Sequence, residues 1–115
     1  MDNVIEQKSF QFAIQSVQLY KYLSVQKKEF VLSKQLLRSG TSIGANIAEA
    51  QQAQSRADFV SKMSIALKET TETKYWLRLL YSTEYIEKDC FDSIFFHCVE
   101  IEKILVSILK TAKNQ

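Results

Sequence analysis

The chain has 115 residues, 46% hydrophobic and 24% charged, with a formal net charge of +2. This length suits a single domain, and the balance of apolar and charged residues excludes a disordered or fibrous chain. Proline is absent and glycine occurs twice, which favours a few long helices over many short strands. No apolar run reaches the roughly 18 to 20 residues that span a bilayer, so we expect a cytoplasmic protein without membrane contact.

The first predicted helix spans residues 3–24. Asn3 is expected to cap its first turn, and Glu6, three residues later, completes a capping box. Apolar residues at three- and four-residue spacing predict the face that packs on the core. They are Phe10, Ala13, Ile14, Val17 and Tyr20, and the stripe is widened by Phe12, Leu19 and Leu23.

The second predicted helix spans residues 32–52 and follows a short polar connection, which returns it antiparallel to the first. Its predicted buried edge contains Leu32, Leu36, Ile43, Ile47 and Ala50.

Small residues recur every four positions on another side of this helix, at Gly40, Gly44 and Ala48. A glycine in a helix interior costs about 1 kcal/mol relative to alanine. Two explanations remain open: close approach of another backbone, or a kink near Gly40.

The third and fourth predicted helices span residues 56–82 and 89–112. Ser55, followed by Asp58, is a second capping signal. Both helices repeat apolar or small residues at alternating spacings of four and three, as expected for nearly antiparallel neighbours. The predicted seams are Phe59, Met63, Ala66, Thr70, Thr73, Leu77 and Leu80 in the third helix, and Phe91, Ile94, Cys98, Ile101, Leu105, Ile108 and Ala112 in the fourth.

Four amphipathic helices joined by short links cannot bury their apolar stripes singly. The sequence therefore predicts an all-α fold, a single-domain antiparallel four-helix bundle with up-down-up-down topology over residues 1–115.

Residues that carry chemistry are sparse. His97 is the single histidine, and no His, Cys, Asp and Glu cluster has metal-ligand spacing. Cys90 and Cys98 lie roughly 12 Å apart along one predicted helix, beyond the reach of a disulfide, and Cys98 is expected in the core. Nucleotide-binding glycine loops are absent. We therefore expect no catalytic residue, no cofactor and no metal.

A polar stripe on the second helix contains Arg38, Ser42 and Glu49, with Asn46 at its border. Arg38 and Glu49 are about 16 Å apart along the helix axis, so they cannot pair with each other. Solvent exposure, hydrogen bonds within the chain and a subunit interface all remain open for these residues.

The segment LLRSGTSIGANIAEA at residues 36–50 resembles the conserved core of the 23S rRNA intervening-sequence protein family, whose members are small four-helix bundles. In that family the pattern runs approximately Leu-Arg-Arg-Ala and then Ser-Ile-Pro-x-Asn-Ile-Ala-Glu-Gly. Gly44 stands in place of its proline, Gly40 in place of an alanine and Ala50 in place of the last glycine. The family motif falls here on Arg38, Ser42, Asn46, Ile47, Ala48 and Glu49, besides Leu37 and Ile43.

Members of this family mostly lack an assigned activity. A related group, the accessory variability proteins of diversity-generating retroelements, looks like pentameric barrels that bind RNA and a reverse transcriptase. The resemblance therefore implies a non-enzymatic homo-oligomer, with a ring of five as the expected assembly, that scaffolds RNA or DNA and contacts a reverse transcriptase or another protein.

Basic residues on the first and third helices and the first connection are the candidate nucleic-acid contacts, although solvated helix faces explain the same charges. The alternative function is a protein-interaction module without a nucleic-acid role, anchored by Tyr75, Trp76 and Tyr81. The candidate nucleic-acid contacts are Lys21, Lys27, Lys28, Arg56, Lys62, Lys68, Lys74 and Arg78.

Overall fold

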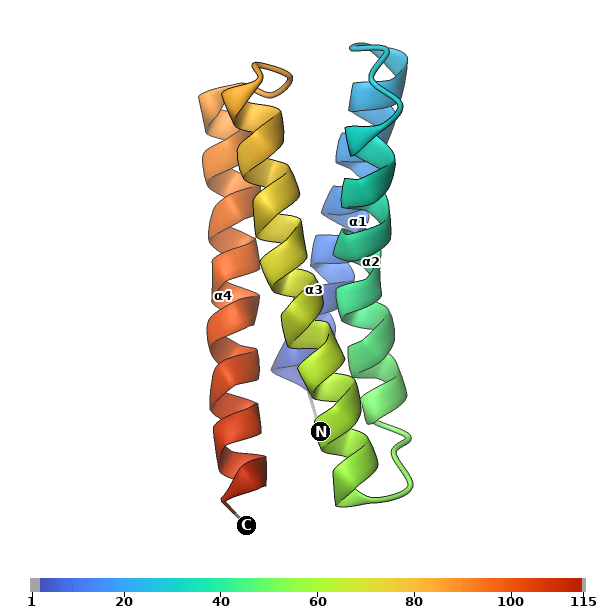
Figure 1. The fold of residues 1–115 in the computed structure, drawn as a ribbon, viewed down its shortest axis with the longest axis vertical. Coiled ribbons are helices and arrows are strands. Elements are labelled where there is room, and N and C mark those ends of the chain that lie inside the picture. Colours follow the sequence, from blue (N-terminus) through green and yellow to red (C-terminus); the bar gives the residue numbers. More distant parts are fainter. Residues whose placement is uncertain (1–2, 115) are drawn as a thin grey trace.

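The computed structural model describes residues 3–114, and within them the chain forms four helices that run alternately up and down (Figure 1). They are α1 (Val4–Val25), α2 (Leu32–Ala50), α3 (Arg56–Ser82) and α4 (Lys88–Lys113). The predicted all-α fold class is confirmed. None of the helices in this part of the chain is long and apolar enough to cross a membrane.

The helix bounds differ from the predicted ones by at most one residue, except at the end of α2. This helix ends at Ala50 instead of Gln52. The amide of Gln52 donates to the carbonyl of Glu49 at 3.0 Å, and the amide of Ala53 donates to that of Ala50 at 3.1 Å. These three-residue hydrogen bonds replace the four-residue bonds of an α-helix, so the chain tightens into a turn two residues early.

Both predicted N-terminal caps are present. The Asn3 side chain accepts a hydrogen bond from the amide of Glu6 at 3.2 Å, and Ser55 Oγ accepts one from the amide of Asp58 at 3.0 Å. Each cap satisfies one of the amides that a helix start leaves without a backbone partner.

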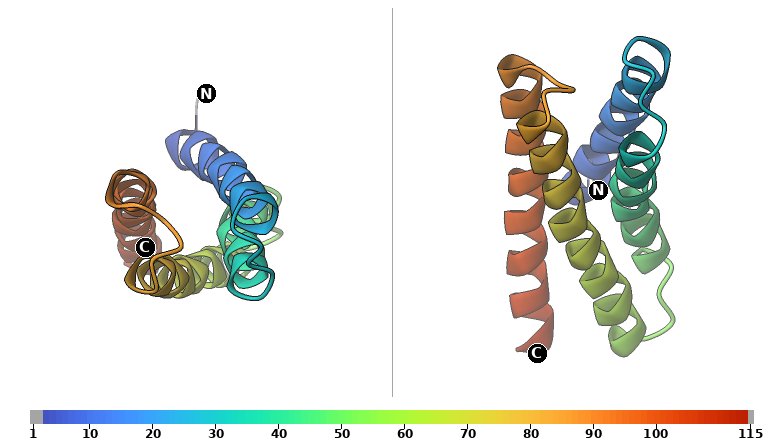
Figure 2. Two further views of the ribbon diagram at one scale, coloured as in Figure 1. Left: turned by 90° about the horizontal axis from the view of Figure 1, so that it is seen from above. Right: turned by 45° about the horizontal axis from the view of Figure 1, so that its top comes forward.

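Neighbouring helices do not contact one another equally. The molecule measures 46 × 23 × 20 Å, and α2 packs extensively on both α1 and α3, whereas α1 and α4 share the fewest contacts. In the view from above, α1 and α4 border the open side of the bundle (Figure 2). Two polar pairs link α1 to α4: Lys8 Nζ lies 3.2 Å from Glu100 Oε2, and Gln15 Oε1 lies 3.0 Å from His97 Nδ1.

The core lies along the predicted seams of α2, α3 and α4. Thr70 and Thr73 are fully buried among the apolar residues of α3, and their hydroxyls donate to the carbonyls of Leu67 and Glu69 within the same helix. Because these donors are satisfied locally, threonine can occupy a core position. The apolar core residues of the three helices are Leu36, Ile43, Ile47, Ala50, Met63, Ala66, Leu77, Leu80, Ile94, Cys98, Ile101, Leu105 and Leu109.

The main stripe predicted for the buried face of α1 is wrong, whereas the residues expected to widen it, Phe12, Leu19 and Leu23, are buried. Phe10 is 65% exposed and Ile14 is 38% exposed, while Ala13, Val17 and Tyr20 are half-buried. The face that packs on the core carries two serines among its apolar residues, so apolar spacing alone places the centre of the buried face on the wrong side of the helix. This buried face contains Ile5, Ser9, Phe12, Ser16, Leu19 and Leu23.

The serines are buried because α1 and α2 approach closely at the two glycines. A Cβ atom at Gly40 would lie 2.2 Å from Ser16 Oγ and 2.9 Å from Ser16 Cβ, and one at Gly44 would lie 3.2 Å from the carbonyl oxygen of Ser9. The close-approach interpretation is therefore confirmed for both glycines. The helix continues through Gly40, and Ala48, the third small residue, is exposed.

Candidate functional site

The displaced apolar stripe of α1 gives the molecule an apolar outer surface. Phe10 and Ala13 from α1 and Thr41, Ala45 and Ala48 from α2 line one side of a surface hollow of about 1260 Å³ around the N-terminal half of α1. We call these five residues, together with Ile14 and Val17, the outer face of the α1–α2 hairpin. The α2 residues of this outer face have small side chains, so they do not cover the Phe10 ring, which projects from the surface.

The charged residues of the family motif join α2 to α3. Arg38 forms salt bridges with Glu69, at 3.2 Å, and with Glu72. Glu49 forms one with Lys62 at 2.9 Å. The hydrogen bond from Trp76 Nε1, together with that from Arg38, lowers the pKa of Glu72. The two ends of the polar stripe on α2 are thus neutralised within the chain.

The other motif residues act within α2. Ser42 Oγ donates to the carbonyl of Arg38 at 2.6 Å, and Asn46 Nδ2 donates to the carbonyl of Ser42 at 2.9 Å. Ile47 is fully buried, and Ala48 lies on the outer face of the hairpin. The motif therefore contributes to helix packing through most of its residues and to the outer face through Ala48.

The eight candidate nucleic-acid contacts do not gather into one patch. Lys62 is paired with Glu49, and Lys74 Nζ lies 3.0 Å from Glu102 Oε1. Arg56 lies at the first residue of α3, while Arg78 lies in its last two turns near the other end of the bundle. The remaining candidates are exposed: Lys21, Lys27 and Lys28 at the end of α1 and in the connection after it, and Lys68 on α3.

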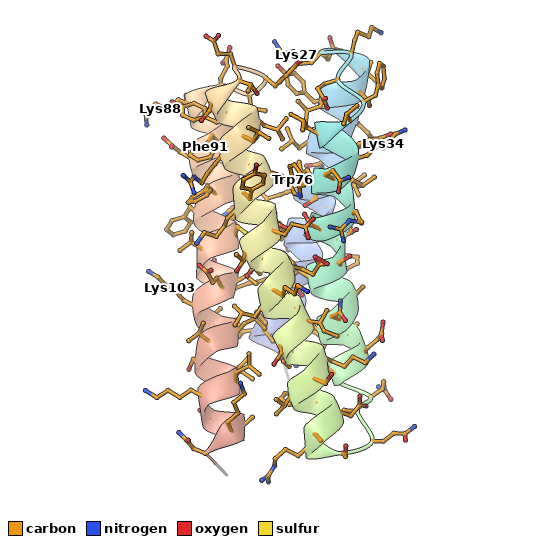
Figure 3. All side chains as sticks on the ribbon, viewed as in Figure 1. Lys27, Lys34, Trp76, Lys88, Phe91 and Lys103 are labelled. Carbon is orange, nitrogen blue, oxygen red and sulfur yellow. The ribbon has the colours of Figure 1, made fainter. Side chains whose placement is uncertain are left out.

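A ninth basic residue, Lys34, was missed by the sequence analysis. It is exposed in the first turn of α2, at the same end of the bundle as Lys27 (Figure 3). The sequence does indicate that a lysine here lacks acidic neighbours along the chain, because Glu29 is the single acidic residue between Gln7 and Ala48.

The carboxylate of Glu29 is committed to the start of α2. It accepts hydrogen bonds from the backbone amides of Val31, Leu32 and Ser33 at 3.2, 3.0 and 2.7 Å. Burial disfavours the charged carboxylate, but these amides outweigh that effect and lower the pKa of Glu29. The negative charge therefore stabilises the N-terminal end of α2, where the helix dipole is positive.

The remaining chemistry-bearing residues, Cys90, His97 and Cys98, all lie on α4, and Cys90 is exposed. Cys98 is fully buried, and burial raises the pKa of its thiol to about 12. His97 is half-buried and pairs with Gln15. Across residues 3–114, no three His, Cys, Asp or Glu side chains are grouped so that they could hold a metal ion.

The aromatic anchors of the alternative function differ in availability. Trp76 is half-buried and donates to Glu72, and Tyr81 stacks on Phe91 with ring centroids 4.6 Å apart. Tyr75 is 57% exposed, and its ring meets Trp76 edge-on.

Comparisons with known proteins find a sequence family and a solved structure that this chain resembles. The sequence profile of a family described as "23S rRNA-intervening sequence protein" matches residues 1–107. A crystal structure of a protein of unknown function from the S23 ribosomal protein family of Bacteroides thetaiotaomicron VPI-5482 superposes with a TM-score of 0.93 and 60% sequence identity. The match covers 94% of this chain and 96% of that one. No curated protein matches the chain.

Proposed function

The chain belongs to the 23S rRNA-intervening sequence protein family, and we propose that it is a non-enzymatic homo-oligomer that associates through the outer face of the α1–α2 hairpin. The observation that carries this proposal is the projecting Phe10, 65% exposed beside Ile14. Residues with the spacing of a core-facing stripe lie instead on the surface.

A contiguous apolar surface of this kind is typical of a protein contact, because water-exposed apolar area is stabilised when it is covered. A second copy is the partner that is always present at the same concentration as the face itself. Contacts between copies generate a closed dimer or a ring, depending on the rotation between them. The ring of five expected from the sequence would have a mass of about 67 kDa, five times the 13.3 kDa chain.

The variant that tests this face is Phe10→Ser combined with Ile14→Ser. Both side chains are exposed in the single chain, so their replacement leaves the bundle core intact. We expect light scattering to show a mass that falls toward one chain, with unchanged helical circular dichroism. Phe96→Ser removes an equally exposed phenylalanine, 66% exposed on α4, and is the matched control that retains the assembly. An unchanged mass for the double variant would remove this face from the proposal.

We further propose that the assembly contacts nucleic acid through cations that have no acidic partner. Lys68 and Arg78 are exposed on α3, and neither forms a salt bridge within the described chain. Lysine and arginine side chains that are free to move can each neutralise one phosphate and release its counterions, and repetition in an oligomer multiplies such contacts.

The test is binding of a labelled single-stranded RNA, followed by fluorescence anisotropy between about 50 and 200 mM salt. Lys68→Gln with Arg78→Gln should weaken binding and lower the slope of log affinity against log salt by roughly 0.7 per lost contact. Lys103→Gln, a neutralisation on α4 outside the candidate set, is the control. Lack of association at the lowest salt concentration would reject nucleic-acid binding and leave self-association standing.

A further inference from the structure

Exposed apolar side chains gather where α1 ends and α2 begins. Val31 is 70% exposed, Val25 60%, Phe30 51% and Tyr22 39%. All four lie within ten consecutive residues around one connection, at one extremity of the 46 Å long molecule. We call them, with the four lysines described next, the α1–α2 end.

The same end is strongly basic. Lys21, Lys27, Lys28 and Lys34 are all exposed, and none of them forms a salt bridge within residues 3–114. Lys27 Nζ lies 5.9 Å from the centre of the Tyr22 ring, which keeps its charge beside an aromatic surface. Glu29, the one acid in this stretch, is buried, and its carboxylate accepts a hydrogen bond from the amide of Ser33 at the start of α2.

Other charges restrict how a partner can approach. The turn between α3 and α4, at the same extremity, contains Glu84 and Glu87, and Asp89 follows in the first turn of α4; all three are exposed. A negatively charged partner is therefore attracted to the α1–α2 corner and repelled from the neighbouring one. An approach with the α1–α2 connection foremost satisfies both conditions.

The apolar residues distinguish between negatively charged partners. Nucleic acid accounts for the lysines, and bases can stack on Phe30 and Tyr22. Of the four apolar side chains at this end, the two most exposed, Val25 and Val31, are aliphatic and gain little from phosphates or base edges. The headgroup region of an anionic bilayer accounts for both kinds of residue, because it receives apolar side chains while its phosphates attract lysine.

We propose that the α1–α2 end is a peripheral contact site for an anionic lipid bilayer. Val25, Phe30 and Val31 enter the boundary between headgroups and acyl chains, and the lysines around them contact lipid phosphates. The sequence lacks an apolar run long enough to span a bilayer. A surface contact requires none, so the lack of a spanning helix among residues 3–114 does not oppose it.

The experiment is flotation of the full chain with vesicles of phosphatidylcholine alone or with about 30% phosphatidylglycerol. We expect the chain to bind the anionic vesicles and not the neutral ones. Lys27→Gln with Lys28→Gln should weaken binding about 25-fold, since one lysine near the surface contributes about fivefold. Phe30→Ser with Val31→Ser should weaken it by about tenfold or more, because two apolar side chains no longer leave water.

Two matched controls lie away from this end, both at exposed positions on α4: Lys103→Gln and Val106→Ser. They should bind vesicles as the unaltered chain does. All six substituted positions are exposed, and circular dichroism checks that each variant remains helical.

Three results would overturn the proposal. The first is no flotation with anionic vesicles. The second is unchanged flotation of the Phe30→Ser and Val31→Ser variant, which would reduce the contact to a general attraction for polyanions. The third is a loss of oligomeric mass or of RNA binding by this variant, with no vesicle binding by the unaltered chain or any variant. A loss of oligomeric mass would assign the α1–α2 end to a second copy, and a loss of RNA binding would assign it to nucleic acid.

Discussion

Replacement of Gly40 by alanine tests the close packing of α1 on α2. In an exposed helix this change would stabilise the protein by about 1 kcal/mol through helix propensity. Here the new Cβ would lie 2.9 Å from Ser16 Cβ and 2.2 Å from Ser16 Oγ. The nearer atom can rotate away, but Ser16 Cβ is fixed to the backbone, so the two helices must separate.

Overpacking of this kind costs about 1 to 3 kcal/mol. We take the upper value because a contact between two Cβ atoms cannot be relieved by a change of rotamer. After the gain in helix propensity is subtracted, the free energy of unfolding of Gly40→Ala should fall by about 2 kcal/mol. The midpoint of urea unfolding should fall by about 1 M.

Circular dichroism in urea at one fixed protein concentration measures this change, since stability of an oligomer depends on concentration. Gln35→Gly, at an exposed position of the same helix outside the outer face, measures the propensity effect alone and should destabilise by about 1 kcal/mol. Ser16→Gly should rescue part of the loss in the double variant. If Gly40→Ala instead stabilises the protein by about as much as Gln35→Gly destabilises it, the close approach is refuted.

Three further outcomes can be checked in the same chain. Glu29→Ala should lower the free energy of unfolding by about 1 to 2 kcal/mol at pH 7. The folded-state pKa of Glu29 is lowered. Its contribution to the free energy of unfolding is therefore present above the ordinary carboxyl pKa and is lost as the pH falls through the folded-state pKa. Urea titrations of the unaltered chain and of Glu29→Ala should converge below about pH 4. Arg38→Ala should destabilise by about 1 kcal/mol, since this arginine is half exposed and its pairs are screened; a change above 3 kcal/mol would contradict that. An aromatic disulfide reagent at pH 8 should modify Cys90, which is exposed, and spare Cys98, whose thiol pKa is about 12; equal rates in the folded protein would contradict the burial of Cys98.

The α3 seam could be predicted from the sequence because its periodicity survives the presence of threonine. Thr70 and Thr73 hold the four-and-three spacing between Ala66 and Leu77, and both are fully buried. A threonine hydroxyl that donates to its own helix does not disturb the pattern.

The buried face of α1 could not be predicted in the same way. Apolar spacing selected Phe10 and Ile14, because two serines interrupt the face that is buried. Ser9 and Ser16 lie in the core since Gly44 and Gly40 on another helix bring the backbones together. That pairing of small residues across two helices cannot be seen along either helix alone.

The ion pairs of the candidate nucleic-acid contacts could not be predicted from the sequence either. Lys62 and Lys74 read as free basic residues, but their partners Glu49 and Glu102 lie on other helices. Salt bridges between helices depend on which faces meet, which the charge pattern along one helix does not determine. The basic α1–α2 end, in contrast, could be found from the sequence, since acids are nearly absent from residues 7–48.

The central claim is that the outer face of the α1–α2 hairpin is covered by another copy of the chain. Light scattering coupled to size-exclusion chromatography, at micromolar concentration and physiological salt, tests it most directly. We expect a mass of two or more times 13.3 kDa, about 67 kDa for a ring of five, and a shift to lower mass with Phe10→Ser and Ile14→Ser. A single species of about 13 kDa for the unaltered chain would contradict it.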